Sequence, residues 1–96
     1  MTTQVIAALK AEIDGLDWFQ QMHLCNGLLT PGRIKRAKIA RMADIIFDMP
    51  LAGKSVLDIG CWDGAYSVEA ARRGASRVLA TDHFVWHASR TGRRLQ

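Results

Sequence analysis

Apolar residues recur at helical spacing over the first part of the chain. Their period predicts a short amphipathic helix over residues 3–14 that ends near Gly15 and needs a partner to cover its apolar side. The apolar positions are Val5, Ile6, Leu9 and Ile13. Residues 16–30 have no regular period but carry many large side chains, among them Trp18 and Phe19, so we expect an ordered loop or a short helical turn there.

A second helical pattern follows Pro31 and Gly32. Apolar residues after this pair fall on one side of a predicted helix, and most basic residues fall on the other. The apolar positions are Ile34, Met42, Ile45, Ile46 and Met49. Pro50 ends the helix in this prediction, because proline has no N–H to donate and restricts the residue before it.

The next part of the chain has strand, helix and strand signals in that order. Residues 55–59 (SVLDI) form a short apolar run followed directly by glycine, which is typical of a buried parallel strand. Residues 65–73 are good helix formers, and Gly74 stands where a left-handed cap is expected. Residues 77–81 (RVLAT) predict a second strand. The order predicts a βαβ unit with a right-handed crossover, and therefore an α/β fold.

These elements divide the chain into three parts. Residues 1–50 are an N-terminal helical and loop region, residues 51–86 the start of an α/β domain, and residues 87–96 an irregular basic tail. Two strands leave both sheet edges unpaired and much apolar helix surface uncovered, so we expect an incomplete fold. A truncated non-catalytic fragment, or a module that associates with itself, therefore stays open beside an active enzyme.

Composition limits the class of protein. Hydrophobic residues make up 49% and charged residues 23%, which is typical of a chain with a core and not of a disordered one. Cys25 and Cys61 form no C-x-x-C pair, so they suggest neither metal nor redox chemistry. The first ten residues lack the features of a secretory signal, and no apolar run approaches the roughly 18 residues of a membrane span, so we expect a cytoplasmic chain without a membrane partner.

The formal net charge of +4 comes largely from two basic clusters. They contain Arg33, Lys35, Arg36, Lys38 and Arg41 in the middle of the chain, and Arg90, Arg93 and Arg94 near its end. Clusters of this kind can contact a polyanion such as RNA, but they also occur as a solvated helix face and a basic tail. Charge alone leaves both interpretations open.

The chemistry is concentrated in residues 56–64 (VLDIGCWDG), a glycine-bearing turn between a strand and a helix. Such a turn lets a ligand approach the backbone, with the loop N–H groups facing it. The dinucleotide fingerprint G-x-G-x-x-G needs a second glycine so that pyrophosphate can approach, and Trp62 occupies that position. The phosphate loop G-x-x-x-x-G-K-[ST] is also absent, which argues against binding of a nucleoside triphosphate. An NAD-binding oxidoreductase remains a weaker alternative.

S-adenosylmethionine (SAM) suits this turn better because it has no phosphate. Its cationic sulfonium and its two free ribose hydroxyls are groups that carboxylates bind. Asp58 lies near the carboxyl end of the first strand, where ligands bind in open α/β sheets. Asp82 ends the second strand, where an acidic side chain can accept both ribose hydroxyl hydrogens.

These residues resemble a known family. The VLDIGCWDG string, the AxxxGA pattern that follows it and the ATD at the end of the second strand are similar to the first motifs of class I SAM-dependent methyltransferases, which have a Rossmann-like fold. The WDG variant, the RRGA after it, DHFxW, an upstream WF pair and a TPG element are similar to the subgroup of tRNA wobble-uridine (5-methoxyuridine-forming) methyltransferases. The resemblance covers about residues 13–86, whereas that fold has about seven strands, so it implies the N-terminal cofactor-binding part of such an enzyme.

The resemblance also implies roles for particular residues. Those expected to bind SAM are Asp58, Gly60, Cys61 and Gly64 on the methionine and sulfonium side, Asp82 at the ribose, and His83 and Phe84 beside the adenine. The implied reaction is methyl transfer from SAM to an RNA or small-molecule acceptor, with no catalytic base assigned. Trp62 stands where most members of the class have glycine or another small residue. Its side chain is more simply interpreted as a packed aromatic than as a platform for a substrate.

Three further side chains have plainer interpretations. Asp63 stands where it can cap the helix that starts near Gly64. His23 could act as a base, but a lone histidine in a loop is more often structural. His83 and His87 are four residues apart, but no third ligand of the right type is nearby, so we expect no metal site.

Overall fold

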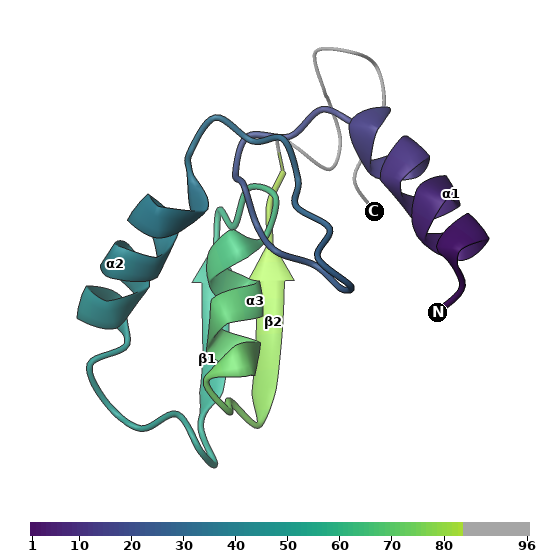
Figure 1. The fold of residues 1–96 in the computed structure, drawn as a ribbon. Coiled ribbons are helices and arrows are strands. Elements are labelled where there is room, and N and C mark those ends of the chain that lie inside the picture. Colours follow the sequence, from purple (N-terminus) through teal and green to yellow (C-terminus); the bar gives the residue numbers. More distant parts are fainter. Residues whose placement is uncertain (84–96) are drawn as a thin grey trace.

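The structure, a computed structural model, describes residues 1–83 of the chain. This part is a small α/β fold with three helices and a two-stranded parallel sheet (Figure 1). The elements in chain order are α1 (Thr3–Asp14), α2 (Arg36–Ile46), β1 (Ser55–Ile59), α3 (Ala65–Arg72) and β2 (Arg77–Thr81). The sequence predicted each of them. No helix within residues 1–83 has both the length and the apolar character needed to cross a bilayer.

The two strands pair in parallel and in register, from Ser55 opposite Arg77 to Ile59 opposite Thr81. α3 covers one face of the pair, and in Figure 1, seen from that side with both strands pointing up, β2 lies to the right of β1. The crossover is therefore right-handed, as predicted. Gly74, directly after α3 and its cap residue, has φ +95°, the left-handed conformation expected there.

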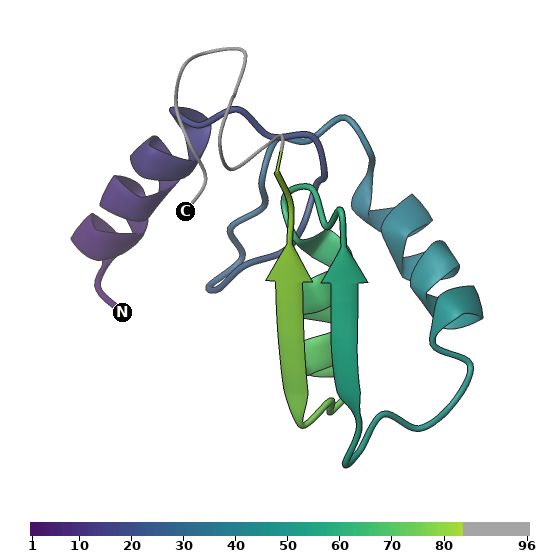
Figure 2. The same ribbon diagram turned by 180° about the vertical axis from the view of Figure 1, so that it is seen from behind.

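The other face of the sheet is uncovered within the described residues. Figure 2 shows the strands from this side, with no helix in front of them. Leu57, Ile59 and Leu79 are 58%, 78% and 51% exposed. Because the second face of a parallel sheet is usually buried, these side chains form an unusually open apolar surface.

α1 lies beside the βαβ unit and not on it, as both views show (Figures 1 and 2). The helix begins where the Thr2 side-chain oxygen accepts the Val5 N–H at 3.2 Å. Its buried residue is Ile13, in the last turn, whereas Val5 is 46% exposed. The Trp18 indole N–H donates to the Ile13 carbonyl at 2.7 Å. This hydrogen bond connects the end of α1 to the loop that follows.

α2 buries a different side from the predicted one. Ile39 and Ala43 are 3% and 0% exposed, and Ile39 packs with Met22 of the preceding loop and Ala65 of α3. Of the five predicted apolar positions, Ile34 packs against this core from outside the helix. The other four, Met42, Ile45, Ile46 and Met49, are 39%, 69%, 52% and 51% exposed.

The predicted side of α2 was wrong: Ile34 and Met49 lie outside the helix, and the predicted residues within it are exposed, because the helix meets Met22 and Ala65 through Ile39. The small Ala43 instead allows a close approach to the core. The helix also ends at Ile46, and Phe47 has already left the helical conformation with ψ 60°. Pro50 is therefore not the direct cause of the helix end.

The connecting segment (residues 16–34) joins α1 to α2 and is ordered by hydrogen bonds. Thr30 is fully buried; its hydroxyl donates to the Gln20 carbonyl at 2.7 Å and accepts the Met22 N–H at 2.9 Å. Gly32 lies so close to this backbone that a Cβ on it would be 2.1 Å from the Gln20 carbonyl carbon. The TPG element therefore has a packing role that requires a hydroxyl and a glycine at these two positions.

Candidate functional site

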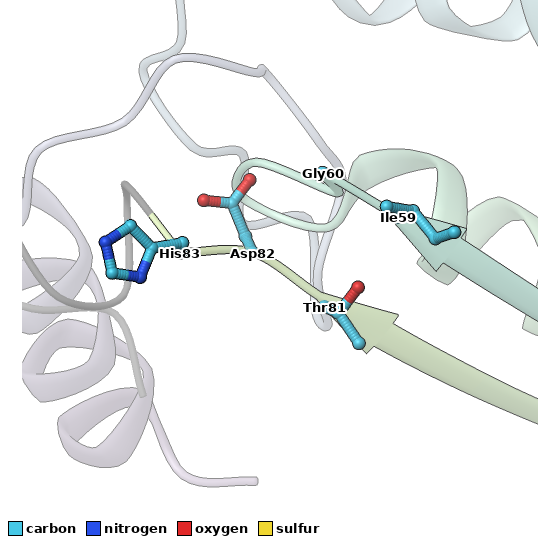
Figure 3. Close-up of a pocket in the computed structure, with 5 residues that line it drawn as sticks. All are labelled: Ile59, Gly60, Thr81, Asp82 and His83. Carbon is cyan, nitrogen blue, oxygen red and sulfur yellow. The ribbon is translucent and has the colours of Figure 1, made fainter.

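An open hollow of about 510 Å³ lies at the carboxyl ends of β1 and β2. Its lining residues are Ile59, Gly60, Thr81, Asp82 and His83 (Figure 3). Three of them, Gly60, Asp82 and His83, are among the residues that the sequence analysis expects to bind a cofactor. Ligands of open parallel α/β sheets bind at this edge, so the hollow is the candidate site.

The turn from β1 to α3 borders the hollow and contains three left-handed residues. The φ angles are +70° at Gly60, +56° at Trp62 and +98° at Gly64. Glycine adopts this conformation freely, whereas a residue with a Cβ pays about 1–2 kcal/mol. Trp62 therefore carries backbone strain that its surroundings must offset.

The N–H groups of this turn are bonded within the protein. Those of Gly60 and Cys61 both donate to the Thr81 carbonyl, at 2.7 and 2.9 Å, and that of Gly64 donates to the Cys61 carbonyl at 2.9 Å. The prediction that the loop N–H groups face a ligand is wrong for these three, because the turn closes onto the end of β2. These three N–H groups are thus not available to a phosphate group in the hollow.

Asp82 connects the end of β2 to the turn. Its carboxylate accepts the Trp62 backbone N–H at 2.8 Å, and Figure 3 shows the side chain directed toward the turn that starts at Gly60. A carboxylate can accept about four hydrogen bonds, so this bond is compatible with a second role toward a ligand in the hollow. The residue expected to hold a ribose also fixes the turn.

The Trp62 side chain packs against the connecting segment. Its ring meets that of Phe19 edge-on, with centroids 5.0 Å apart and an interplanar angle of 63°. Trp62 is not among the residues that line the hollow. The indole therefore does not obstruct the candidate site. Trp62 is a packed aromatic residue, the simpler of its two interpretations.

Asp58 lies on the α3 side of β1, away from this hollow. The Ser67 hydroxyl donates to its carboxylate at 2.7 Å. Asp58 borders a smaller space of about 200 Å³, together with Ile46 and Tyr66 among others. The structure thus separates Asp58 from Gly60 and Asp82, although the sequence analysis grouped them.

Cys61 and Gly64, although expected to bind the cofactor, do not line the hollow and belong to the turn that borders it. Cys61 is 3% exposed, and its burial, together with the nearby carboxylates of Asp58 and Asp82, raises the pKa of the thiol to about 11. The thiol is therefore protonated near neutral pH and is not directed into the hollow. Gly64 is the N-cap residue of α3 and allows the turn to reach that helix.

Asp63 does not cap α3, contrary to the prediction. Its carboxylate oxygen Oδ2 accepts the backbone N–H groups of Phe19 and Gln20, at 2.7 and 2.6 Å, and α3 has no side-chain cap from its N-cap residue. Burial raises the pKa of Asp63, while these two hydrogen bonds lower it and the carboxylates of Asp17 and Asp82 raise it further. The half-buried Asp63 carboxyl group thus joins the turn to the connecting segment.

Two more contacts attach the connecting segment to α3. The Gln20 side-chain oxygen accepts the Ala65 N–H at 3.1 Å and so caps α3 from a distant part of the chain. The Arg72 guanidinium donates to the carbonyls of His23 and Leu24. The sequence did not predict these two contacts between the connecting segment and α3. The signal for them was the resemblance of the upstream WF and TPG elements to those of the methyltransferase subgroup.

The remaining candidates lie elsewhere. His23 belongs to the connecting segment and does not line the hollow, while Phe84 and His87 lie outside the described residues. Within residues 1–83, no three His, Cys, Asp or Glu side chains group in a way that could hold a metal ion.

No protein-family model, curated protein or solved structure matches this chain.

Proposed function

We propose that the chain is the N-terminal cofactor-binding part of a SAM-dependent methyltransferase with a Rossmann-like fold. The observation that carries the proposal is the position of Asp82 and Gly60 in one hollow at the carboxyl ends of two parallel strands. A carboxylate at the end of the second strand suits a ribose with free hydroxyls, and a glycine with φ +70° allows close approach to the backbone.

The hydrogen bonds of the turn favour SAM over a phosphate-bearing cofactor. The N–H groups of Gly60 and Cys61 are directed to the Thr81 carbonyl, and that of Trp62 to the Asp82 carboxylate. A pyrophosphate would bring negative charge toward Asp82, and these three N–H groups already have other acceptors. SAM brings a positive sulfonium and no phosphate, so the same arrangement is favourable for it.

In the proposed reaction, a nucleophile on the acceptor attacks the methyl group of SAM in line with the departing sulfur. The chain's own contribution is to bind and orient the nucleoside part of SAM, through Asp82 at the ribose and the Gly60 backbone beside it. A base is needed only where the acceptor must lose a proton, and none is assigned within residues 1–83.

Calorimetric titration of the full chain with SAM tests the cofactor. Asp82→Asn keeps an oxygen that can accept the Trp62 N–H but removes the charge and one acceptor, so it is expected to weaken binding by about tenfold or more. Asp48→Asn, an exposed acid after α2, is the matched control and should bind as the wild type does. No saturable heat with SAM, or tighter binding of NAD, would contradict the proposal.

The proposed acceptor is RNA, because of the basic cluster around α2. Arg33, Lys35, Arg36, Lys38 and Arg41 are all exposed, and within residues 1–83 none of them forms an ion pair. RNA binding should weaken with salt, and replacing Lys38 and Arg41 by Gln should make that salt dependence shallower by about 0.7 per lost phosphate contact. Lys10→Gln, which removes a lysine paired with Asp14, is the control. Equal slopes for all variants would favour a small-molecule acceptor.

A second candidate function is self-association of a non-catalytic chain. The open sheet face of Leu57, Ile59 and Leu79 favours it, because an apolar surface of this kind is normally covered. Sedimentation over a range of concentrations tests this candidate. A dimer that is lost in Leu79→Lys, in a chain that binds no SAM, would support it over the methyltransferase.

A further inference from the structure

A line of contacts connects Phe19 to Asp82 through Trp62. The Phe19 ring packs edge-on against the Trp62 ring at 5.0 Å, and the Trp62 backbone N–H donates to the Asp82 carboxylate at 2.8 Å. Phe19 is itself fixed, because its N–H donates to Asp63, the residue after Trp62, at 2.7 Å. The connecting segment thus holds the turn at two adjacent residues.

Trp62 is the strained member of this line. Its φ of +56° suits glycine, and a bulky residue keeps it only where surrounding contacts compensate the strain. A return to negative φ would change the direction of the neighbouring peptide groups and weaken the bond to Asp82. The edge-on contact with Phe19 is one such contact, and it acts directly on the Trp62 ring.

We propose that Phe19 is a positioning residue for Asp82. Its ring holds Trp62 in the left-handed conformation, and the Trp62 N–H in turn fixes the Asp82 carboxylate at the edge of the hollow. The effect on a bound nucleoside rests on the proposed function, whereas the effect on the Trp62–Asp82 bond does not. The connecting segment therefore acts on the candidate site without lining it.

Amide hydrogen exchange of the full chain tests the bond itself. Phe19→Leu keeps an apolar side chain but removes the ring, and it should speed exchange of the Trp62 amide by about tenfold, the equivalent of one hydrogen bond to a charged group. The Val68 amide, which donates to the Gly64 carbonyl within α3, should be unchanged. Phe47→Leu, at the half-buried Phe47 after α2, is the matched control and should leave both amides as in the wild type.

Nucleoside binding tests the consequence for the site. The wild type should prefer adenosine to 2′,3′-dideoxyadenosine by about tenfold, because Asp82 accepts the ribose hydroxyls. Phe19→Leu should reduce this preference to less than about threefold, whereas Phe47→Leu should retain it. A preference ratio, unlike an affinity, is insensitive to a general loss of folded protein.

A double-mutant cycle separates positioning from general packing. Trp62→Gly keeps the backbone N–H and adopts φ +56° without strain, so the turn no longer needs the ring contact. In that background Phe19→Leu should change neither the exchange of amide 62 nor the nucleoside preference, and the two substitutions should be strongly non-additive.

Two results would overturn the inference. One is a Phe19→Leu variant with wild-type exchange at Trp62, and the other is an effect of equal size in the Trp62 and Trp62→Gly backgrounds, which would make Phe19 a packing residue only. A wild type that binds neither nucleoside would count against the proposed function alone, since the exchange measurement still decides the role of Phe19.

Discussion

The carboxylate of Asp63 accepts the backbone N–H of Phe19 at 2.7 Å, although the two residues are 44 positions apart. The same oxygen also accepts the N–H of Gln20. These bonds attach the connecting segment to the turn between β1 and α3, and through it to the candidate site. The connecting segment therefore helps to hold the turn that borders the candidate site.

Loss of the hydrogen-bond acceptor at position 63 should destabilise the fold. Asp63→Ala leaves two backbone N–H groups without their acceptor, and we expect a loss of about 1–3 kcal/mol in the free energy of unfolding. Urea denaturation followed by circular dichroism measures it. A midpoint equal to that of the wild type would show that water replaces the carboxylate at no cost. Asp48→Asn, which changes an exposed acid, should have little effect.

The pH dependence of stability should reveal the burial of Asp63. Because its pKa is raised in the folded state, the folded chain binds more protons than the unfolded one above pH 3.8, and the contribution of Asp63 to stability falls as pH rises through the folded pKa. Asp63→Asn keeps an oxygen that can accept both N–H groups and has no charge to bury.

We therefore expect Asp63→Asn to match or exceed the wild type in stability at pH 7, with the difference shrinking as the pH falls toward 4. Comparison of the two proteins at each pH cancels the other titrating groups. A difference that grows on acidification would mean that the hydrogen bonds outweigh desolvation, and the direction of the pKa shift would be wrong.

Gly32→Ala should be one of the most damaging small substitutions in the chain. The new Cβ would lie 2.1 Å from the Gln20 carbonyl carbon, so backbone must move, and we expect a loss of about 3 kcal/mol. Gly27→Ala is the control: its Cβ meets nothing within 4 Å, but φ is +76°, so a loss of about 1 kcal/mol is expected. Thermal unfolding of both variants tests which one loses more stability. A larger loss of stability in Gly27→Ala than in Gly32→Ala would contradict the prediction.

The two cysteines should differ strongly in reactivity. Cys25 is exposed, whereas Cys61 is buried with a pKa of about 11, so the nucleophilic thiolate of Cys61 is scarce at pH 8. Alkylation with iodoacetamide, followed by mass spectrometry, should modify Cys61 at least about tenfold more slowly than Cys25. The difference should vanish in urea. Equal rates in native buffer would show that the turn opens readily.

The secondary structure was predictable because its signals are local. The period of apolar residues, the SVLDI and RVLAT runs and Gly74 fix α1, the βαβ unit and its cap, and their order alone favours a right-handed crossover. The inner face of α2 was not predictable in this way. Which side of that helix is buried depends on the close contact of Ile39 with Met22 and Ala65, residues from two other parts of the chain.

The candidate site was likewise predictable only in part. The meeting of Gly60 and Asp82 at one edge of the sheet follows from the order of elements along the chain, because parallel strands in register bring their carboxyl ends together. The contact of Asp58 with Ser67 on α3, and those of Asp63 and Trp62 with the connecting segment, could be known only from the folded chain. Strand period and turn chemistry act over a few residues, whereas these partners are set by packing between segments that the sequence keeps far apart.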